Sequence, residues 1–131
     1  MPRYAHPDVL DNGLAYLKAN TNKIAVISSY TLAESYAAVA AKILAEATMA
    51  PTDLIIADGA SSSRELTSAA KTDTSANATD AASVTKHVAF LDTLTSKVLY
   101  VTPAPASVAT TAGSPVNIAP VVVRIPQPVA V

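Results

Sequence analysis

The sequence predicts a mainly β protein, an antiparallel β-sandwich with a short helix near its N-terminus. Roughly seven or eight short runs rich in β-branched residues follow one another along the chain. Turn signals separate these runs about every ten residues, which is the spacing typical of a sandwich. The 131 residues suit a single domain, and neither an internal repeat nor a linker divides them. We therefore expect one domain over residues 1–131.

The first element expected is a helix over residues 7–19, PDVLDNGLAYLKA. Three leucines recur at helical spacing in it, and Pro7 suits a first-turn position. Gly13 costs about 1 kcal/mol relative to alanine inside a helix, so single helical turns are the alternative. Residues 23–29, KIAVISS, form a short apolar run with β-branched residues and predict a buried strand.

Residues 32–49, LAESYAAVAAKILAEATM, allow two interpretations. The stretch has high helix propensity and apolar residues at helical spacing, which favour one helix over its whole length. In the alternative, residues 35–39 are irregular and residues 43–49 form a strand. The residues alone favour the helix.

The second half of the chain predicts further short strands. Residues 53–57 (DLIIA) and 64–70 are the first of these, and the polar residues 71–83 predict a surface loop or a poorly packed edge. Two apolar runs, 87–91 and 97–102, then flank the polar link 92–96, a pattern typical of an antiparallel hairpin. The remaining expectations are a short strand at 107–111, a turn at 112–114, and a last strand beginning at 116 that is an edge strand or bulged at Pro120. Extended arms are expected over 1–7 and 124–131.

Composition gives no general reason to bind nucleic acid or a membrane. Formal net charge is −1 and there is no cysteine, so neither a basic surface nor a disulfide or thiolate site is expected. No apolar run approaches the roughly 20 residues that cross a bilayer. The first residues, MPRYAHPDVLDNG, lack the apolar region of a secretory signal, so we expect synthesis into the cytoplasm.

The two histidines are weak candidates for chemistry. His87 with Asp92 and a nearby serine suggests a Ser–His–Asp arrangement, but no nucleophile-elbow motif accompanies it. We expect His87 to be a partly exposed strand histidine, and His6 to be a terminal or capping residue. Two distant histidines without cysteine are poor material for a zinc site, and the three glycines form no phosphate-binding loop. We therefore expect no catalytic residue, no cofactor and no metal.

The stretch from Val98 to Val123 carries no charged residue. In one interpretation, half of its apolar area is core and the rest is ordinary exposed valine and alanine. The functional interpretation is an interface with a partner or with further copies of the chain, because large exposed apolar patches are uncommon on monomers.

Several segments resemble the small structural proteins of tailed bacteriophages. The best markers are LDNGLAYLK near the N-terminus, the HVAFLD and SKVLYVT runs of the hairpin, and TAGSPVNIAP before the last strand. The resemblance covers nearly the whole chain. Proteins of this kind look like jelly-roll β-sandwich decoration (cement) proteins of the capsid shell. The chain departs from them by being richer in alanine and poorer in glycine, notably over residues 37–47, and the resemblance favours the strand alternative there.

The resemblance implies a function on the capsid surface of a virion, after synthesis in the host cytoplasm. It implies binding at junctions between major capsid proteins as a dimer or trimer, with no cofactor and no active site. The alternative is a tail, head–tail joining or host-surface adhesin component. The expected partner contacts lie on the two arms: Pro2, Arg3, Tyr4 and His6 at the N-terminus, and Arg124, Ile125, Gln127 and Val129 at the C-terminus.

Overall fold

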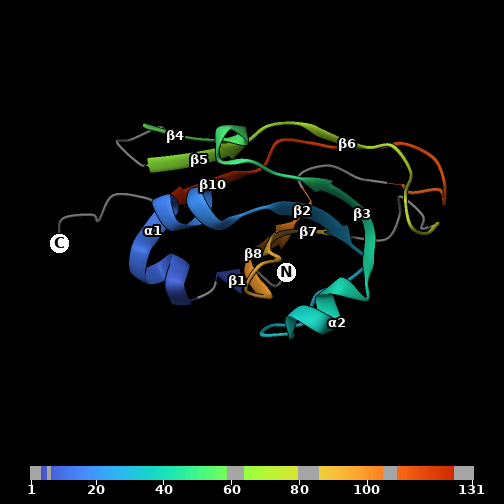
Figure 1. Cartoon of the computed structure of the whole chain (residues 1–131), viewed down its shortest axis with the longest axis horizontal. Coiled ribbons are helices and arrows are strands. Elements are labelled where there is room, and N and C mark those ends of the chain that lie inside the picture. Colours follow the sequence, from blue (N-terminus) through green and yellow to red (C-terminus); the bar gives the residue numbers. More distant parts are fainter. Residues whose placement is uncertain (1–3, 6, 59–63, 80–85, 105–108, 126–131) are drawn as a thin grey trace.

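The computed structural model is mainly β, with 47% strand and 16% helix, which confirms the predicted class (Figure 1). It describes residues 4–5, 7–58, 64–79, 86–104 and 109–125. The helical segments are α1 (Pro7–Asn20), α2 (Tyr36–Ala40) and the 3-10 turn η1 (Pro51–Asp53). The strands are β1 (Tyr4–Ala5), β2 (Lys23–Ile27), β3 (Ile43–Thr48), β4 (Leu54–Asp58), β5 (Arg64–Ser68), β6 (Lys71–Asp73), β7 (His87–Asp92), β8 (Lys97–Pro103), β9 (Val116–Ile118) and β10 (Val122–Ile125).

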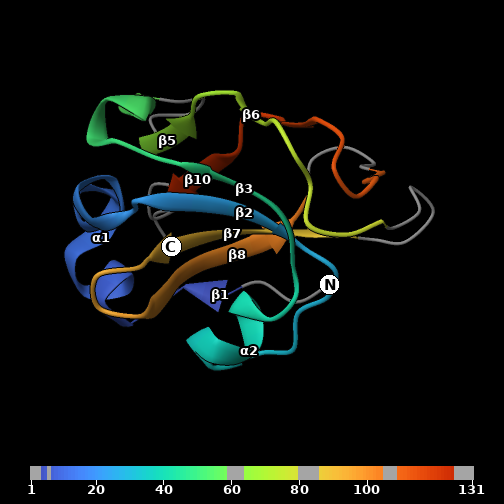
Figure 2. The ribbon, with the colours of Figure 1, turned by 45° about the vertical axis from the view of Figure 1, so that its right-hand side comes forward.

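The strands form antiparallel sheets in two layers. A five-stranded sheet has the order β1-β8-β7-β2-β3, and a three-stranded sheet has the order β10-β5-β4. A two-stranded pair, β6-β9, continues the smaller layer. Figure 2 shows the three-stranded sheet on one side of the five-stranded sheet and α2 on the other side. This arrangement fits the β-sandwich class, and the jelly-roll topology remains an expectation.

The five-stranded sheet is packed on both faces. On one face, Phe90 and Val26 join a core with Leu66 of β5 and Leu17 of α1. On the other face, a second cluster packs α2 and the segment before it against the sheet. Its buried members are Ala25, Ile27, Tyr30, Val39, Ala89, Leu91, Val98 and Val101. All six residues of β7 are buried as a result, because this strand is central in the sheet and covered from both sides.

The predicted N-terminal helix is present and is kinked. α1 contains a non-helical residue, Gly13, with φ 71° and ψ −157°, a conformation that glycine adopts without a Cβ penalty. Leu14 and Leu17 after the kink are buried in the core. Lys18 near the end of α1 donates hydrogen bonds to the carbonyl oxygens of Pro51, at 2.6 Å, and Leu54. These bonds fix the helix to the start of β4.

The helix favoured over residues 32–49 is wrong for most of that stretch. Only Tyr36–Ala40 are helical, with Ser35 as N-cap accepting from the Ala38 amide at 3.2 Å. Ile43–Thr48 form β3, which pairs with β2 along its length. Helix propensity over these residues amounts to a few tenths of a kcal/mol each, and the backbone pairing and core packing available beside β2 outweigh it. The strand alternative was therefore correct for the second half.

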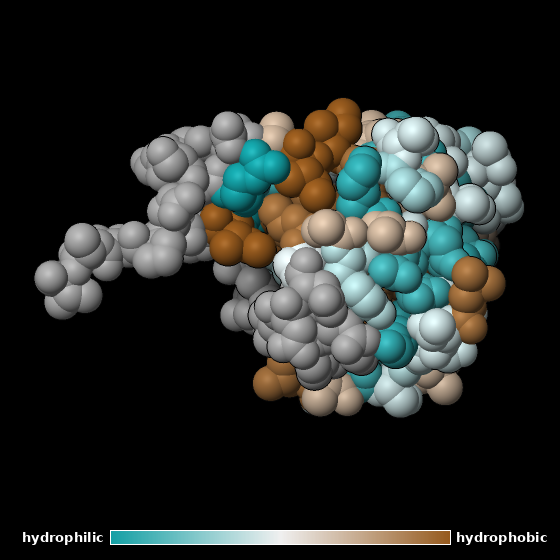
Figure 3. Space-filling view, turned by 60° about the vertical axis from the view of Figure 1, so that its left-hand side comes forward, coloured by the Kyte–Doolittle hydropathy of each residue, from teal (hydrophilic) through white to brown (hydrophobic). Residues whose placement is uncertain are grey.

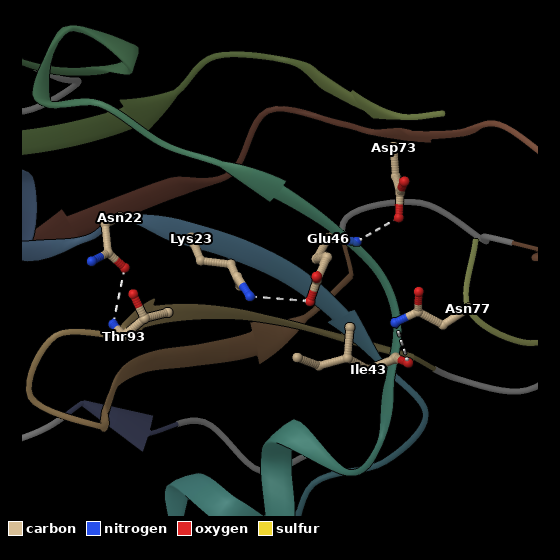
Figure 4. A network of polar contacts seen from close by, with 7 residues as sticks. All are labelled: Asn22, Lys23, Ile43, Glu46, Asp73, Asn77 and Thr93. Carbon is tan, nitrogen blue, oxygen red and sulfur yellow. Dashed lines mark hydrogen bonds and ion pairs between the residues drawn. The ribbon is translucent and has the colours of Figure 1, made fainter. Parts of the chain in front are cut away.

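The polar stretch over 71–83 is also more ordered at its start than expected. Lys71–Asp73 form β6 and pair with β9, and the Thr72 hydroxyl donates to Asn117 Oδ1 at 2.9 Å. Figure 4 shows how this segment is held beside β3: Asp73 Oδ2 accepts from the Glu46 amide at 2.9 Å. The Asn77 amide donates to the Leu44 carbonyl at 2.7 Å. The Asp73 carboxylate and a backbone hydrogen bond from Asn77 thus link this segment to β3, at the edge of the five-stranded sheet.

The hairpin agrees with the sequence, whereas the final strands differ from it in part. β7 and β8 pair antiparallel with the link Asp92–Ser96 between them, and Ser96 adopts a positive φ of 55°. The expected turn at 112–114 contains Gly113 with φ 79°. β9 and β10 lie before and after Pro120 and belong to different sheets, whereas the sequence predicts a single edge or bulged strand across Pro120. Of the strand expected at 107–111, residues 107–108 lie outside the described residues, and residues 109–111 belong to no strand, so that prediction is wrong for them.

Candidate functional site

His87 and Asp92 lie too far apart to act together. They begin and end the same strand, and five steps along a strand span about 17 Å. Their side chains also point to opposite faces, because successive residues of a strand alternate. The Ser–His–Asp arrangement considered for these residues is therefore excluded by the geometry.

His87 is buried, not partly exposed as expected. Its exposed fraction is 5%, and neither ring nitrogen has a hydrogen-bond partner among the described residues. The ring of Tyr30 lies beside it, with centroids 6.4 Å apart. Burial lowers the pKa of His87 from its ordinary value of 6.5 because the charged imidazolium loses its hydration. His87 therefore functions as a neutral core residue of the sheet.

Asp92 organises the β7–β8 turn. Its Oδ1 accepts from the Leu94 amide at 3.0 Å and the Thr95 amide at 3.3 Å, and its Oδ2 accepts from the Thr95 hydroxyl at 2.8 Å. The amide of Thr93 donates to Asn22 Oδ1 at 2.9 Å, which joins the turn to the end of α1 (Figure 4). The Asp92 carboxylate therefore has a structural role that accounts for both of its oxygens.

The strongest candidate for function is the outer face of the three-stranded sheet. Cross-strand register places Ile55, Thr67 and Val122 in one row. The next row on the same face contains Ala57, Glu65 and Arg124. We call these six residues the outer face. Ile55 is 63% exposed and Val122 49% exposed, whereas the residues that alternate with them face the core. Figure 3, turned so that the α1 side of Figure 1 comes forward, shows hydrophobic residues next to hydrophilic ones at the top of the molecule, where Figure 1 places β4 and β5.

An ion pair borders the apolar row of the outer face. Arg124 Nη2 lies 2.6 Å from Glu65 Oε1, and Arg124 Nε donates to the same oxygen at 2.8 Å. The pair joins β10 to β5 directly across the register. The pair contributes little to stability, at most about 1 kcal/mol, because the Arg124 side chain is 53% exposed and solvent screens the interaction. Its position gives the face an apolar row with a polar border, the pattern of a protein interface.

Two hollows border β10. The β8–β10 hollow, of about 440 Å³, is lined by Tyr100, Thr102, Val122 and Arg124. The α1–β10 hollow, of about 340 Å³, is lined by Leu14, Ala15, Ile56, Arg64 and Ile125. The last strand therefore contributes residues to both hollows and to the outer face.

The structure divides the eight predicted contact residues into three groups. Pro2, Arg3, His6, Gln127 and Val129 lie outside the described residues. Tyr4 belongs to β1, which pairs with Tyr100 and Val101 of β8, so this part of the expected N-terminal arm is a strand of the sheet. Arg124 and Ile125 belong to β10, so the expected C-terminal arm begins inside a strand, and each residue lines one hollow.

Ile55 is the important surface residue that the sequence did not indicate. It stands in the run DLIIA, which predicts a buried strand without showing which of its residues face the core. Only the pairing of Ile55 with Thr67 identifies it as outward-facing. Strict alternation of apolar and polar residues would have shown which side chains face outward. The adjacent isoleucines, Ile55 and Ile56, break that alternation.

Among the described residues, no group of three His, Cys, Asp or Glu side chains could hold a metal ion. No helix in that part of the chain is long and apolar enough to span a membrane. Comparisons with protein families, with curated proteins and with solved structures find no match to this chain.

Proposed function

We propose that the chain is a structural virion protein, a decoration (cement) protein that binds the capsid shell at junctions between major capsid proteins and stabilises it. The outer face is the observation that carries the proposal, and the resemblance to small bacteriophage structural proteins gives it direction. The protein acts on the capsid surface as a dimer or trimer, after synthesis in the host cytoplasm.

The outer face suits a seam between protein subunits. Burying Ile55 and Val122 removes two large apolar side chains from water, which contributes about 25 cal/mol per Å². The Glu65–Arg124 pair lies where it can remain partly hydrated at the border of the contact. A small contact of this kind is weak when single. Many copies bound around one shell, and several contacts within an oligomer, make a modest affinity per contact sufficient.

The test is a titration of purified protein onto expanded capsids that lack it. We expect saturable binding, with hundreds of copies per particle and a raised temperature of capsid disruption. Absence of binding would overturn the proposal. Binding of about a dozen copies or fewer would instead support the alternative, a tail, head–tail joining or adhesin component.

A pair of variants tests whether the outer face makes the contact. The double variant Ile55→Thr, Val122→Thr keeps β-branched residues in both strands and removes apolar surface. Its matched control is Leu32→Thr, because Leu32 is also 63% exposed and lies outside the three-stranded sheet. We expect the double variant to weaken capsid binding by about tenfold and the control to bind normally. Equal binding of the two proteins would exclude the outer face as the contact.

A further inference from the structure

β10 is an edge strand of the three-stranded sheet, and no other described strand pairs with the side that faces away from β5. The Ser68 amide donates to the carbonyl of Val121, the residue opposite it, at 2.9 Å. Along an antiparallel ladder, hydrogen-bonded pairs of this kind alternate with pairs that exchange no hydrogen bonds. Val122 and Arg124 therefore direct their backbone N–H and C=O groups away from β5, toward the open side of β10.

The other edges of the two larger sheets are short or covered. β1 contains only two residues. On β3, the Glu46 amide donates to Asp73 Oδ2 at 2.9 Å, and on β4 the Leu54 carbonyl accepts from Lys18. Proteins protect edge strands in such ways because an unpaired edge can accept a further strand. Among the described residues, no hydrogen bond of this kind reaches the open side of β10.

The β8–β10 hollow lies beside this open edge. It is lined by Tyr100 and Thr102 of β8 and by Val122 and Arg124, the two β10 residues whose backbone groups point away from β5. The five-stranded sheet continues past β8 to β1, whereas the three-stranded sheet ends at β10 (Figure 2). The hollow, of about 440 Å³, is therefore a gap between the last strand of the smaller sheet and the facing surface of β8.

We propose that an extended segment of the major capsid protein pairs with β10 as an additional strand and closes the β8–β10 hollow. The inference rests on the proposed function and names the part of the partner that is recognised. Backbone donors and acceptors that recur at every second residue are matched by an extended segment, whose main-chain hydrogen bonds supply the affinity. The same strand edge adjoins the outer face, so one partner can contact both.

The alternation of side chains defines the chemistry of this segment. Every second side chain faces the hollow, where the hydroxyl-bearing residues Tyr100 and Thr102 favour small or polar groups. The side chains between them extend the outer face. An apolar side chain fits beside Val122, and an acidic or polar one fits beside Arg124, whose guanidinium already binds Glu65.

Hydrogen exchange, measured for single amides in the free protein and in capsids saturated with it, tests the pairing. In the free protein, the amides of Val122 and Arg124 should exchange at least about tenfold faster than those of Val123 and Ile125, which face β5. On the capsid, exchange at Val122 and Arg124 should slow by at least about tenfold. Slow exchange at these two amides in the free protein would show that the edge is already covered and would overturn the proposal.

Two substitutions at Val122 separate the backbone contact from the side-chain contact. Val122→Pro removes the N–H group on the open side and leaves the hydrogen bonds to β5 in place, a position in which edge strands accept proline. Val122→Thr also removes apolar surface but keeps the N–H group. We expect the proline variant to bind capsids at least about tenfold more weakly than the threonine variant. Equal binding of the two folded variants would overturn the proposal.

Filling the hollow gives a second measurement if far-UV circular dichroism shows that Val122→Pro does not fold. Thr102→Trp places a large ring in the hollow, and its matched control is Thr48→Trp, at an exposed residue of β3 that does not line it. We expect only Thr102→Trp to weaken capsid binding, by about tenfold, and equal binding would overturn the proposal. Absence of capsid binding by the unmodified protein would overturn the proposed function as well. Capsid binding without slower exchange at Val122 and Arg124 would overturn this inference alone.

Discussion

Replacing Leu66 with alanine tests the packing of the three-stranded sheet on the rest of the protein. Leu66 lies in β5, the central strand of that sheet, and is 0% exposed. The substitution removes three carbon atoms, which is about 2.4 kcal/mol at about 0.8 kcal/mol per methylene. The cavity left behind adds to this cost, so the free energy of unfolding should fall by about 3 kcal/mol.

The matched control is the same substitution at Leu94, which is 89% exposed at the tip of the β7–β8 turn. Leu94→Ala should change stability by less than about 0.5 kcal/mol. Urea denaturation followed by circular dichroism measures both. With a slope of about 2 kcal/mol per molar, Leu66→Ala should lower the midpoint by about 1.5 M. Equal midpoints for the two variants would refute the packing of β5 against the five-stranded sheet.

Three further predictions concern polar groups. Burial lowers the pKa of His87 in the folded state, whereas in the unfolded state His87 takes up a proton near pH 6.5. The free energy of unfolding should therefore fall as the pH drops below about 6.5. His87→Leu should remove this pH dependence between pH 7 and 5. Asp92→Ala should destabilise the turn by about 1–2 kcal/mol in urea denaturation, and Asp92→Asn by less, because Asn keeps one acceptor oxygen. Asp73→Ala should speed hydrogen exchange of the Glu46 amide, its bonded partner.

Each of these results has a contrary outcome. The pKa of Asp53 is lowered by its hydrogen bond from the Ala50 amide and then by Lys71. Carboxylates of this kind lose their contribution to the free energy of unfolding only at a pH below the range used to test His87. An unchanged slope in His87→Leu between pH 7 and 5 would therefore contradict the neutral buried imidazole. An equal loss of unfolding free energy in Asp92→Asn and Asp92→Ala would show that the turn is not stabilised by the side-chain oxygen that asparagine retains. Unchanged exchange at Glu46 in Asp73→Ala would show that backbone pairing alone protects that amide.

The sequence predicted those elements for which the local residue pattern and the contacts with distant strands favour the same structure. The β7–β8 hairpin has apolar strands and a polar turn, so it was expected. Pro120 indicated a disturbance in the last strand, but not that β9 and β10 belong to different sheets. β3 was assigned to a helix because its alanines and Glu46 favour one, and only pairing with β2 decides otherwise. β6 was missed because Lys71–Asp73 offers no apolar pattern, and it depends on contacts with β9 and β3 that lie far away in sequence.

The candidate surface was predicted only in part, for a similar reason. Arg124 and Ile125 were selected from the chain end, and both border hollows. The outer face required the register of three strands, which places Ile55 and Val122 in one row on either side of Thr67, from distant parts of the chain. The burial of His87 depends on Tyr30 and on the cover over the second face of the sheet. Such cover cannot be deduced from the alternation within one strand.

The order of strands in the two sheets has a consequence for how the chain is made. β1 pairs only with β8, which is made much later, and β2 needs β7 on one side. β5 can pair with β4 early, but its second neighbour, β10, is the last strand to be made. Pairings so distant in sequence make folding slow, on the order of milliseconds to seconds. During synthesis the edge of β2 is open, and an open edge can pair with a neighbouring nascent chain. Slower synthesis at a reduced temperature should therefore raise the yield of correctly folded protein from a host that makes it in large amounts.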